Sequence, residues 1–400
     1  MTTLLLVFAA VLLLGVLVSG LAHRTVLSTA ALFLVAGFVL GDEVLGVLRI
    51  QGTDLIRVLA ELALFAVLFT DGMRVGFRDL RSAWRLPGRA LFFGLPLTLA
   101  ATTLLARYVV GLGWAESFLI GAVLAPTDPV FAAALVGREE VPRRLRHLLN
   151  VESGLNDGLA LPFVIVLLAV VGREPTHPGE LLSEIALGIA IGIAIPLAAI
   201  WLERLRFFSA STAYEPLNAF AIGLLVLAVA QATHGNLYLA AFAAGVTVAT
   251  YGPQQRESFE RFGELLAELL KLAALLVFGA LISPSFLAEI PVVGWVFAVL
   301  TLLAARPVAL AFSLAGSTLP WGERAAAAWF GPKGFASVVY GLLVLQSGIP
   351  GAEKIFHLVA LVIVLSILAH SSTDILVARR LGGTEEEPPP RPDVRDGLHV

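Results

Sequence analysis

Long apolar stretches recur along almost the whole chain, and short segments between them carry most of the charges. A membrane-spanning helix needs about 20 predominantly apolar residues. This pattern predicts thirteen spanning helices, at residues 3–20, 26–41, 53–72, 90–110, 115–137, 148–171, 181–202, 215–233, 236–251, 265–284, 291–316, 324–347 and 355–377.

The arginines between these spans are distributed unequally. The loops that follow the odd-numbered spans are arginine-rich, with Arg74, Arg78, Arg81, Arg138, Arg143 and Arg144 among their residues. Loops rich in Lys and Arg stay in the cytoplasm. We therefore predict a multi-pass protein of the inner (plasma) membrane, with its N-terminus outside and its C-terminus in the cytoplasm. This orientation requires an odd number of spans and agrees with thirteen.

The composition supports a membrane protein. The 400 residues are 58% hydrophobic and only 14% charged, whereas about 25% of the residues in a soluble domain are charged. Residues 1–380 are predicted to form one transmembrane domain, and the acidic, Pro-rich segment 381–400 a disordered cytoplasmic tail. The chain has no cysteine and no nucleotide-binding motif, so neither thiolate metal sites nor an ATP-driven pump is expected. No cofactor and no nucleic-acid partner are predicted.

One polar stretch interrupts this apolar pattern in the sixth span. Residues 150–158 read NVESGLNDG, with two carboxylates, a hydroxyl and an amide. At helical spacing, Ser153 and Asp157 share one face, and Glu152 and Asn156 share the adjacent one. An ionisable residue inside a membrane span costs roughly 2.5 to 3.5 kcal/mol and indicates function by default. We expect one face to bind a cation and the other to hold the site together.

Two other spans are broken by proline and glycine. The fifth contains Ala125-Pro126-Thr127-Asp128-Pro129, and the twelfth contains Gly331-Pro332-Lys333-Gly334. If the seventh span is a linker, these breaks occupy equivalent places in two inverted six-helix repeats. Paired interruptions at matching positions indicate a transporter's binding site.

The remaining charged residues within spans receive separate interpretations. Arg306, midway along the eleventh span, needs an anionic partner, and we predict a structural pair with Glu152. Asp71 is either an interfacial cap or part of an entry funnel, and the pattern does not separate these two. Lys271 is interpreted as a snorkelling anchor near the inner end of the tenth span.

These motifs together resemble a known family. Thr127-Asp128-Pro129, the run from Glu152 to Gly158, Arg306 and the Gly331–Gly334 break are similar to the bacterial NhaP-type branch of the monovalent cation:proton antiporters, which are prokaryotic relatives of the animal sodium/proton exchangers. The resemblance covers the whole membrane region. It implies thirteen helices in two inverted repeats, a homodimer, and a core bundle that moves against a dimerisation platform.

The resemblance also assigns roles to residues. It implies cation binding by Asp157, with Asp128, Ser153 and the Thr127 carbonyl as further ligands, and a buried pair of Glu152 and Arg306. The family's asparagine falls on Asn156, and its acidic funnel position resembles Asp71. The break in the twelfth span usually carries arginine, and here Lys333 keeps the charge but lacks the planar fork of five donors.

These residues predict how exchange is coupled. Sodium and lithium are hard cations that favour the oxygen ligands offered here, and burial can raise the pKa of a carboxyl group into the physiological range. We expect H⁺ and Na⁺ or Li⁺, or K⁺, to compete for Asp157, and exchange to be electroneutral and one-for-one because Asn156 replaces a second aspartate. The alternatives are an intramembrane aspartyl protease that uses Asp128 and Asp157, and a passive cation channel. Against the protease, the sequence has no Gly-x-Gly-Asp pattern.

Overall fold

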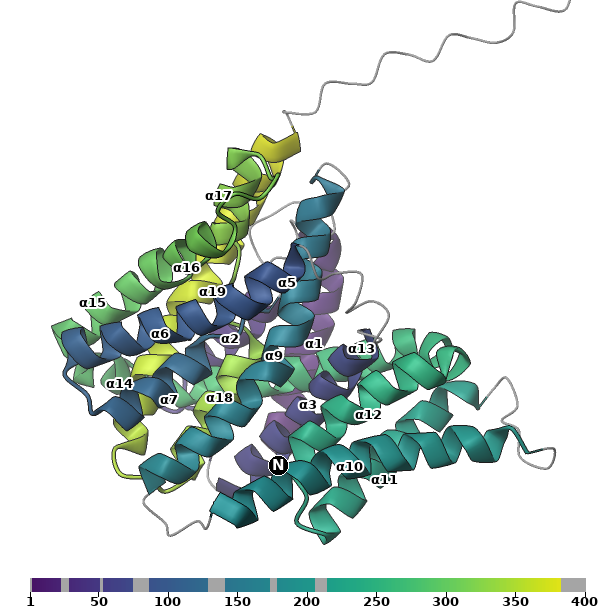
Figure 1. The fold of residues 1–400 in the computed structure, drawn as a ribbon. Coiled ribbons are helices and arrows are strands. Elements are labelled where there is room, and N and C mark those ends of the chain that lie inside the picture. Colours follow the sequence, from purple (N-terminus) through teal and green to yellow (C-terminus); the bar gives the residue numbers. More distant parts are fainter. Residues whose placement is uncertain are drawn as a thin grey trace, which may run out of the picture.

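The structure is a computed structural model, and it describes residues 2–22, 29–50, 53–74, 86–128, 141–172, 178–205 and 214–382. These residues form helices and no named strand (Figure 1). The helices are α1 (Thr2–Ala22), α2 (Thr29–Leu40), α3 (Thr53–Arg74), α5 (Pro87–Arg89), η1 (Ala90–Gly94), α6 (Leu95–Leu105), η2 (Ala106–Val110), α7 (Trp114–Leu124), α9 (Arg143–Gly172), α10 (Pro178–Glu203), α11 (Glu215–Ala232), α12 (Leu237–Tyr251), α13 (Pro253–Leu281), α14 (Pro284–Glu289), α15 (Val292–Leu300), η4 (Thr301–Ala305), α16 (Arg306–Ser313), α17 (Trp321–Trp329), α18 (Phe335–Gln346) and α19 (Ala352–Gly382).

Within the described residues, each of the thirteen predicted spans contains a helix or several consecutive helices, and residues 129–137 of the fifth span lie outside them. Six helical runs among the described residues are long and apolar enough to cross a membrane, and five shorter apolar helices match further spans. The two other spans fall on α3 and α13, which carry more charge. The fold is that of a polytopic helical membrane protein, as predicted.

Two helices begin earlier than their apolar patterns indicate. Helix α9 begins at Arg143 instead of residue 148, and α13 begins at Pro253 instead of residue 265. The first turns of both helices are charged, so a search for apolar windows misses them. Proline is favoured in the first turn because it has no N–H group to leave unsatisfied. At the C-terminus, α19 continues to Gly382, and the rest of the predicted tail lies outside the described residues.

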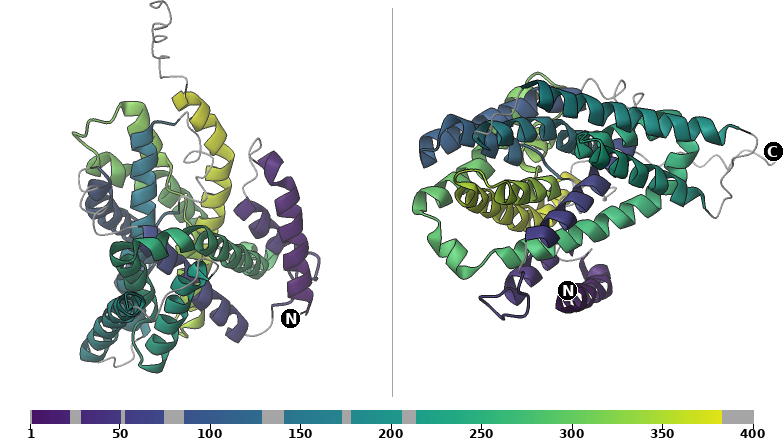
Figure 2. Two further views of the ribbon diagram at one scale, coloured as in Figure 1. Left: turned by 90° about the vertical axis from the view of Figure 1, so that its right-hand side faces the viewer. Right: turned by 90° about the horizontal axis from the view of Figure 1, so that it is seen from below.

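The helices pack as two groups. In the first, which we call the α3–α13 group, α2, α3, α10, α11, α12 and α13 pack on one another, with α1 against α2. In the second, the α9–α18 group, the run from α5 to η2 packs with α7, α9, α15, α16, α17, α18 and α19. Figures 1 and 2 show α10 to α12 away from α15 to α17, and α1 on the outside. The groups meet mainly where α3, α12 and α13 contact α9 and α18.

Glycines allow the closest helix crossings in the α3–α13 group. An ideal Cβ on Gly279 would lie 2.2 Å from the Leu34 carbonyl oxygen, and one on Gly37 would lie 2.2 Å from that of Leu276. Gly72 and Gly245 form a similar reciprocal contact between α3 and α12. Small residues at such crossings let two backbones approach and pack without a hydrophobic driving force.

The two predicted breaks are present, and they meet inside the α9–α18 group. Helix α7 ends at Leu124 and is followed by the non-helical residues 125–128, whereas Pro129 lies outside the described residues. The second break separates α17 from α18 over residues 330–334. The Asp128 backbone N–H donates a hydrogen bond to the Pro332 carbonyl, at 3.1 Å. Each break therefore satisfies a backbone group that the other leaves free, as irregular backbone at membrane depth requires.

Candidate functional site

Polar side chains of α9 lie against the first break. The Thr127 hydroxyl is 3.3 Å from the Ser153 hydroxyl, and it accepts a hydrogen bond from the Asn156 side-chain amide at 2.7 Å. All three side chains are buried. The structure therefore brings together Thr127, Ser153 and Asn156, as the sequence predicts, and the amide of Asn156 serves to hold the Thr127 side chain.

The two aspartates of the motifs are also buried there. Asp128 and Asp157 are each 3% exposed, and their charges lie within electrostatic range of each other. Asp128 Oδ2 accepts a hydrogen bond from the Phe335 backbone N–H in the first turn of α18, where the helix dipole favours negative charge. Among the described residues, Asp157 Oδ1 has no hydrogen-bond partner. A buried carboxylate oxygen in this state favours a ligand that brings a proton or a positive charge.

Gly334 permits this arrangement. An ideal Cβ at position 334 would lie 1.8 Å from the Cβ of Asp128, so any other residue would push the two breaks apart. Gly331 has the same role beside Arg306, where an added Cβ would lie 1.8 Å from the Nε atom. The two glycines of the second break therefore make room for the first break and for a buried guanidinium group.

Glu152 and Arg306 form the predicted ion pair. Arg306 Nη1 donates to Glu152 Oε1 at 2.6 Å, and Nη2 donates to Oε2 at 2.9 Å. Arg306 Nη2 also contacts the Phe330 carbonyl, at 3.2 Å. The pair thus ties α9 and α16 to the end of α17 on the face of α9 next to the one that carries Ser153 and Asp157. Bidentate hydrogen bonding of this kind is the strong form of an arginine–carboxylate interaction.

Lys333 lies within the second break, and its side chain is 2% exposed. Its backbone N–H donates to the Ser366 hydroxyl at 2.8 Å, whereas its Nζ atom has no hydrogen-bond partner among the described residues. The His370 ring, beside Ser366 on α19, bridges to the Trp329 carbonyl at 2.9 Å. Helix α19 therefore packs against the second break, and His370 is a buried residue within this contact.

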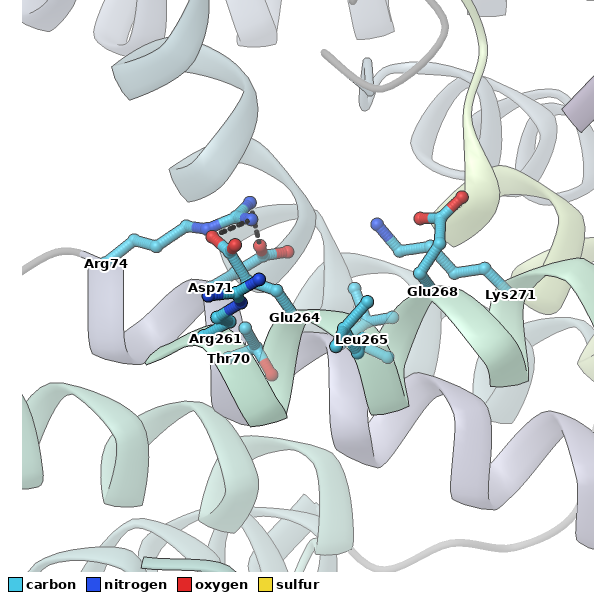
Figure 3. Close-up of a pocket in the computed structure, with 10 residues that line it drawn as sticks. Thr70, Asp71, Arg74, Arg261, Glu264, Leu265, Glu268 and Lys271 are labelled. Atoms are coloured by element: carbon cyan, nitrogen blue, oxygen red, sulfur yellow. Dashed lines mark hydrogen bonds and ion pairs between the residues drawn. The ribbon is translucent and has the colours of Figure 1, made fainter. Parts of the chain in front are cut away.

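A cavity of about 440 Å³ opens beside this site (Figure 3). Asp71 lies in its wall on α3. Arg74 bridges the cavity's two helices, with its Nη1 atom 3.4 Å from Asp71 Oδ1 and its Nη2 atom 2.8 Å from Glu264 Oε1. The charged side chains of the wall are three acids and three bases, Asp71, Glu264, Glu268, Arg74, Arg261 and Lys271.

The interpretation of Lys271 as a snorkelling anchor is wrong. Its side chain is only 8% exposed, and its Nζ atom lies 4.0 Å from Asp128 Oδ2. Because α13 begins at Pro253, twelve residues before the predicted start of the span, Lys271 lies about 27 Å along the helix from its first residue. Figure 3 shows its side chain reaching across the cavity toward Asp71.

The structure adds contacts that sequence reasoning missed. The Tyr340 hydroxyl donates to the backbone carbonyl of Asp157 at 2.8 Å, and the Ser337 hydroxyl donates to the Val123 carbonyl at the end of α7. Tyrosine and serine on apolar helices carry no local signal of such partners. Within the described parts of the chain, no cluster of three or more carboxylate or imidazole groups comes together as a metal site.

A family model described as "Sodium/hydrogen exchanger, transmembrane" matches residues 8–379. The chain belongs to the sodium/hydrogen exchanger family. This family consists of transporters, so neither the comparison nor the site supports an enzyme.

Curated relatives of this exchanger lie in the NhaP-type branch. The chain is 25% identical to the K(+)/H(+) antiporter NhaP2 of Shewanella baltica (strain OS223), over 96% of this chain and 68% of that protein. It is 26% identical to the K(+)/H(+) antiporter NhaP of Alkalimonas amylolytica, over 94% of this chain and 66% of that one. The fold is similar to that of the sodium proton antiporter MjNhaP1 from Methanocaldococcus jannaschii, with a TM-score of 0.78 at 20% identity, over 95% of this chain and 100% of that chain.

Proposed function

We propose that this exchanger carries one monovalent cation in exchange for one proton across the membrane. The observation that carries the proposal is the pair of buried aspartates at the crossing of the two breaks, beside a charged cavity. Asp157 is the exchanging group, and Asp128, the Ser153 hydroxyl and the Thr127 carbonyl complete an all-oxygen ligand set. Hard alkali-metal cations favour such ligands.

Competition between the two cargoes at Asp157 explains the coupling. A carboxylate that has bound either a proton or an alkali-metal cation is neutral and can cross the low-dielectric part of the protein. An empty carboxylate keeps its charge, and the desolvation cost of that charge opposes the crossing. The transporter therefore changes its orientation only when Asp157 carries a cation in one direction and a proton in the other. This requirement produces exchange and prevents leak of either ion alone.

Exchange is electroneutral because Asn156 brings no second charge. Its amide donates to Thr127, so it holds the ligand loop without binding a proton. In proteoliposomes, an imposed membrane potential is expected to leave the exchange rate unchanged. An Asn156→Asp variant adds a titratable group at the same position, and its rate is expected to respond to the potential.

The transported cation is Na⁺, Li⁺ or K⁺. The names of the relatives point to both K⁺ and Na⁺. The choice is testable by adding each chloride salt in turn to vesicles with an internal pH dye. The salt that gives proton flux at the lowest concentration identifies the preferred cation.

We further propose a homodimer in the inner membrane, with the N-terminus outside and the C-terminus in the cytoplasm. The asymmetric distribution of arginine supports this orientation, and the exposed apolar side chains of α1 suit contact with lipid or with a second copy. Cysteine accessibility at the two termini and crosslinking in native membranes test these two statements separately.

The decisive experiment compares Asp157→Asn with Asp42→Asn. Both variants exchange a carboxylate for an amide, but Asp42 is exposed and paired with exposed Arg49 in the loop after α2. We expect Asp157→Asn to abolish cation-dependent proton flux while remaining folded, and Asp42→Asn to keep it. Native exchange by Asp157→Asn refutes the proposal. Cation flux without proton flux in the wild type indicates a passive channel.

A further inference from the structure

Lys271 stands out because it belongs to the other helix group. Its helix, α13, packs with α2 and α3, whereas Asp128 follows α7 in the α9–α18 group. The 4.0 Å contact between Lys271 Nζ and Asp128 Oδ2 is therefore an ion pair that crosses the boundary between the groups. The pair joins a cavity to a ligand, because Lys271 also lines the 440 Å³ cavity.

The ammonium group occupies the place of a cation. Asp128 Oδ2 accepts a hydrogen bond from Phe335 N–H, and the Lys271 ammonium, which also lines the cavity, lies 4.0 Å from the same oxygen. An alkali-metal ion that enters from the cavity meets Lys271 before it can bind Asp128. A Lys ammonium is a compact point charge on a flexible stem, so it can withdraw without any movement of the backbone.

The surroundings give Lys271 an alternative location. Glu268 lies on the same helix three residues earlier, and Asp71 lies across the cavity (Figure 3). Both carboxylates are close enough to the ammonium for a charge interaction. A displaced Lys271 thus keeps acidic neighbours within the cavity, which lowers the cost of giving up Asp128.

We propose that Lys271 is a tethered counter-cation that holds Asp128 when the site is unloaded, and that the transported cation displaces it. This inference rests on the proposed antiport function and adds to it a residue that competes with the cation for Asp128. While the pair is intact, α13 is linked to the ligand loop of the opposite group. Loading with the cation breaks that link, so release of the two groups from each other is coupled to cation binding.

Lysine labelling tests the displacement directly. The chain contains three lysines, Lys271, Lys333 and Lys354. Lys354 is exposed and Lys333 is buried, so they serve as internal standards for full and for minimal reactivity. The purified protein is treated with a small amine-acylating reagent, with and without NaCl or KCl at constant ionic strength, and each lysine is quantified by mass spectrometry.

We expect the cation to raise the labelling of Lys271 several-fold and to leave Lys333 and Lys354 unchanged. In Asp128→Asn, Lys271 is expected to be reactive without cation and to respond no further. Unchanged labelling of wild-type Lys271 at saturating cation overturns the proposal. This readout needs no substitution at Lys271 and no transport.

Transport by two variants gives the second test. Lys271→Met removes the ammonium and keeps an apolar stem, and it is expected to lower the apparent KM for the cation by about tenfold, or about 1.4 kcal/mol in binding. Lys271→Arg keeps a charge and is expected to remain near the wild type, as is the matched control Lys354→Met. An unchanged or raised KM in Lys271→Met overturns the proposal. If the wild type itself shows no cation-dependent proton flux, the antiport function fails instead, and labelling still reports on Lys271.

Discussion

The Glu152–Arg306 pair yields an asymmetric prediction. Both side chains are buried, and two hydrogen bonds of 2.6 and 2.9 Å join them. Removal of one partner leaves the other charge in a low-dielectric interior, which costs about 3 to 5 kcal/mol. The cost depends on which charge remains. A carboxylate can become neutral by binding a proton, but a guanidinium group cannot lose one in a protein.

We therefore expect Glu152→Leu to destabilise the protein more than Arg306→Met does. Unfolding entropy is about 2.1 cal/mol/K per residue, or about 0.8 kcal/mol/K for 400 residues. A loss of about 3 to 5 kcal/mol then lowers Tm by roughly 4 to 6 °C for Glu152→Leu, and Arg306→Met is expected to lower it by about half as much. Thermal unfolding of the detergent-solubilised variants, followed by tryptophan fluorescence, measures the difference.

The double variant completes the test. Glu152→Leu with Arg306→Met replaces a buried ion pair by apolar groups, which is often neutral for stability. Its Tm is expected to exceed that of Glu152→Leu alone. If the two Tm losses simply add, or if Arg306→Met is the more damaging change, then the pair does not stabilise the fold by compensating a buried positive charge.

Three further outcomes follow from local geometry. Gly334→Ala is expected to abolish transport, because its Cβ would overlap Asp128; native exchange rates in vesicles would contradict this overlap. Gly279→Ala is expected to lower Tm, since its Cβ would meet a carbonyl of α2 at 2.2 Å, whereas Gly322→Ala, with open space around it, serves as the control. The hydroxyl and N–H hydrogen bonds of Ser285 lower the pKa of exposed Glu43, so Glu43→Gln is expected to lower Tm slightly at neutral pH. That difference should vanish as the pH falls through the depressed pKa of Glu43, where the carboxylate becomes protonated, and a difference that persists at lower pH would contradict it.

Sequence patterns predicted the helices well because hydropathy and helix-breaking residues are local properties. The thirteen spans and both breaks follow from apolar windows and from prolines such as Pro126 and Pro332. The Glu152–Arg306 pair was also predictable, because an arginine within a span requires an acidic partner. Glu152 was available for this role, since it shares a helix face with Asn156 and not with Ser153 and Asp157. The geometry of this ion pair was not predictable from the sequence, since it depends on how α16 packs against α9.

Lys271 shows where this reasoning ends. In the sequence, Lys271 follows Glu264, Glu268 and the charged segment 253–264. Such a context is typical of a residue near the membrane surface. Only the packing of α13 reveals that the charged half continues the same helix and carries Lys271 inward to Asp128. Contacts between distant elements, such as this one and that of Tyr340 with Asp157, leave no periodic trace in a single sequence.

The Glu152–Arg306 and Lys271–Asp128 ion pairs are both buried, but they differ in geometry and in the helix groups that they join. Glu152 and Arg306 both lie in the α9–α18 group, and two short hydrogen bonds join them. Lys271 and Asp128 belong to different groups, and their single contact of 4.0 Å is longer than a hydrogen bond. The longer Lys271–Asp128 contact is the weaker of the two, and because it lies next to the cavity the transported cation can compete for it. Cation entry therefore replaces the pair between the groups and leaves the pair within one group intact.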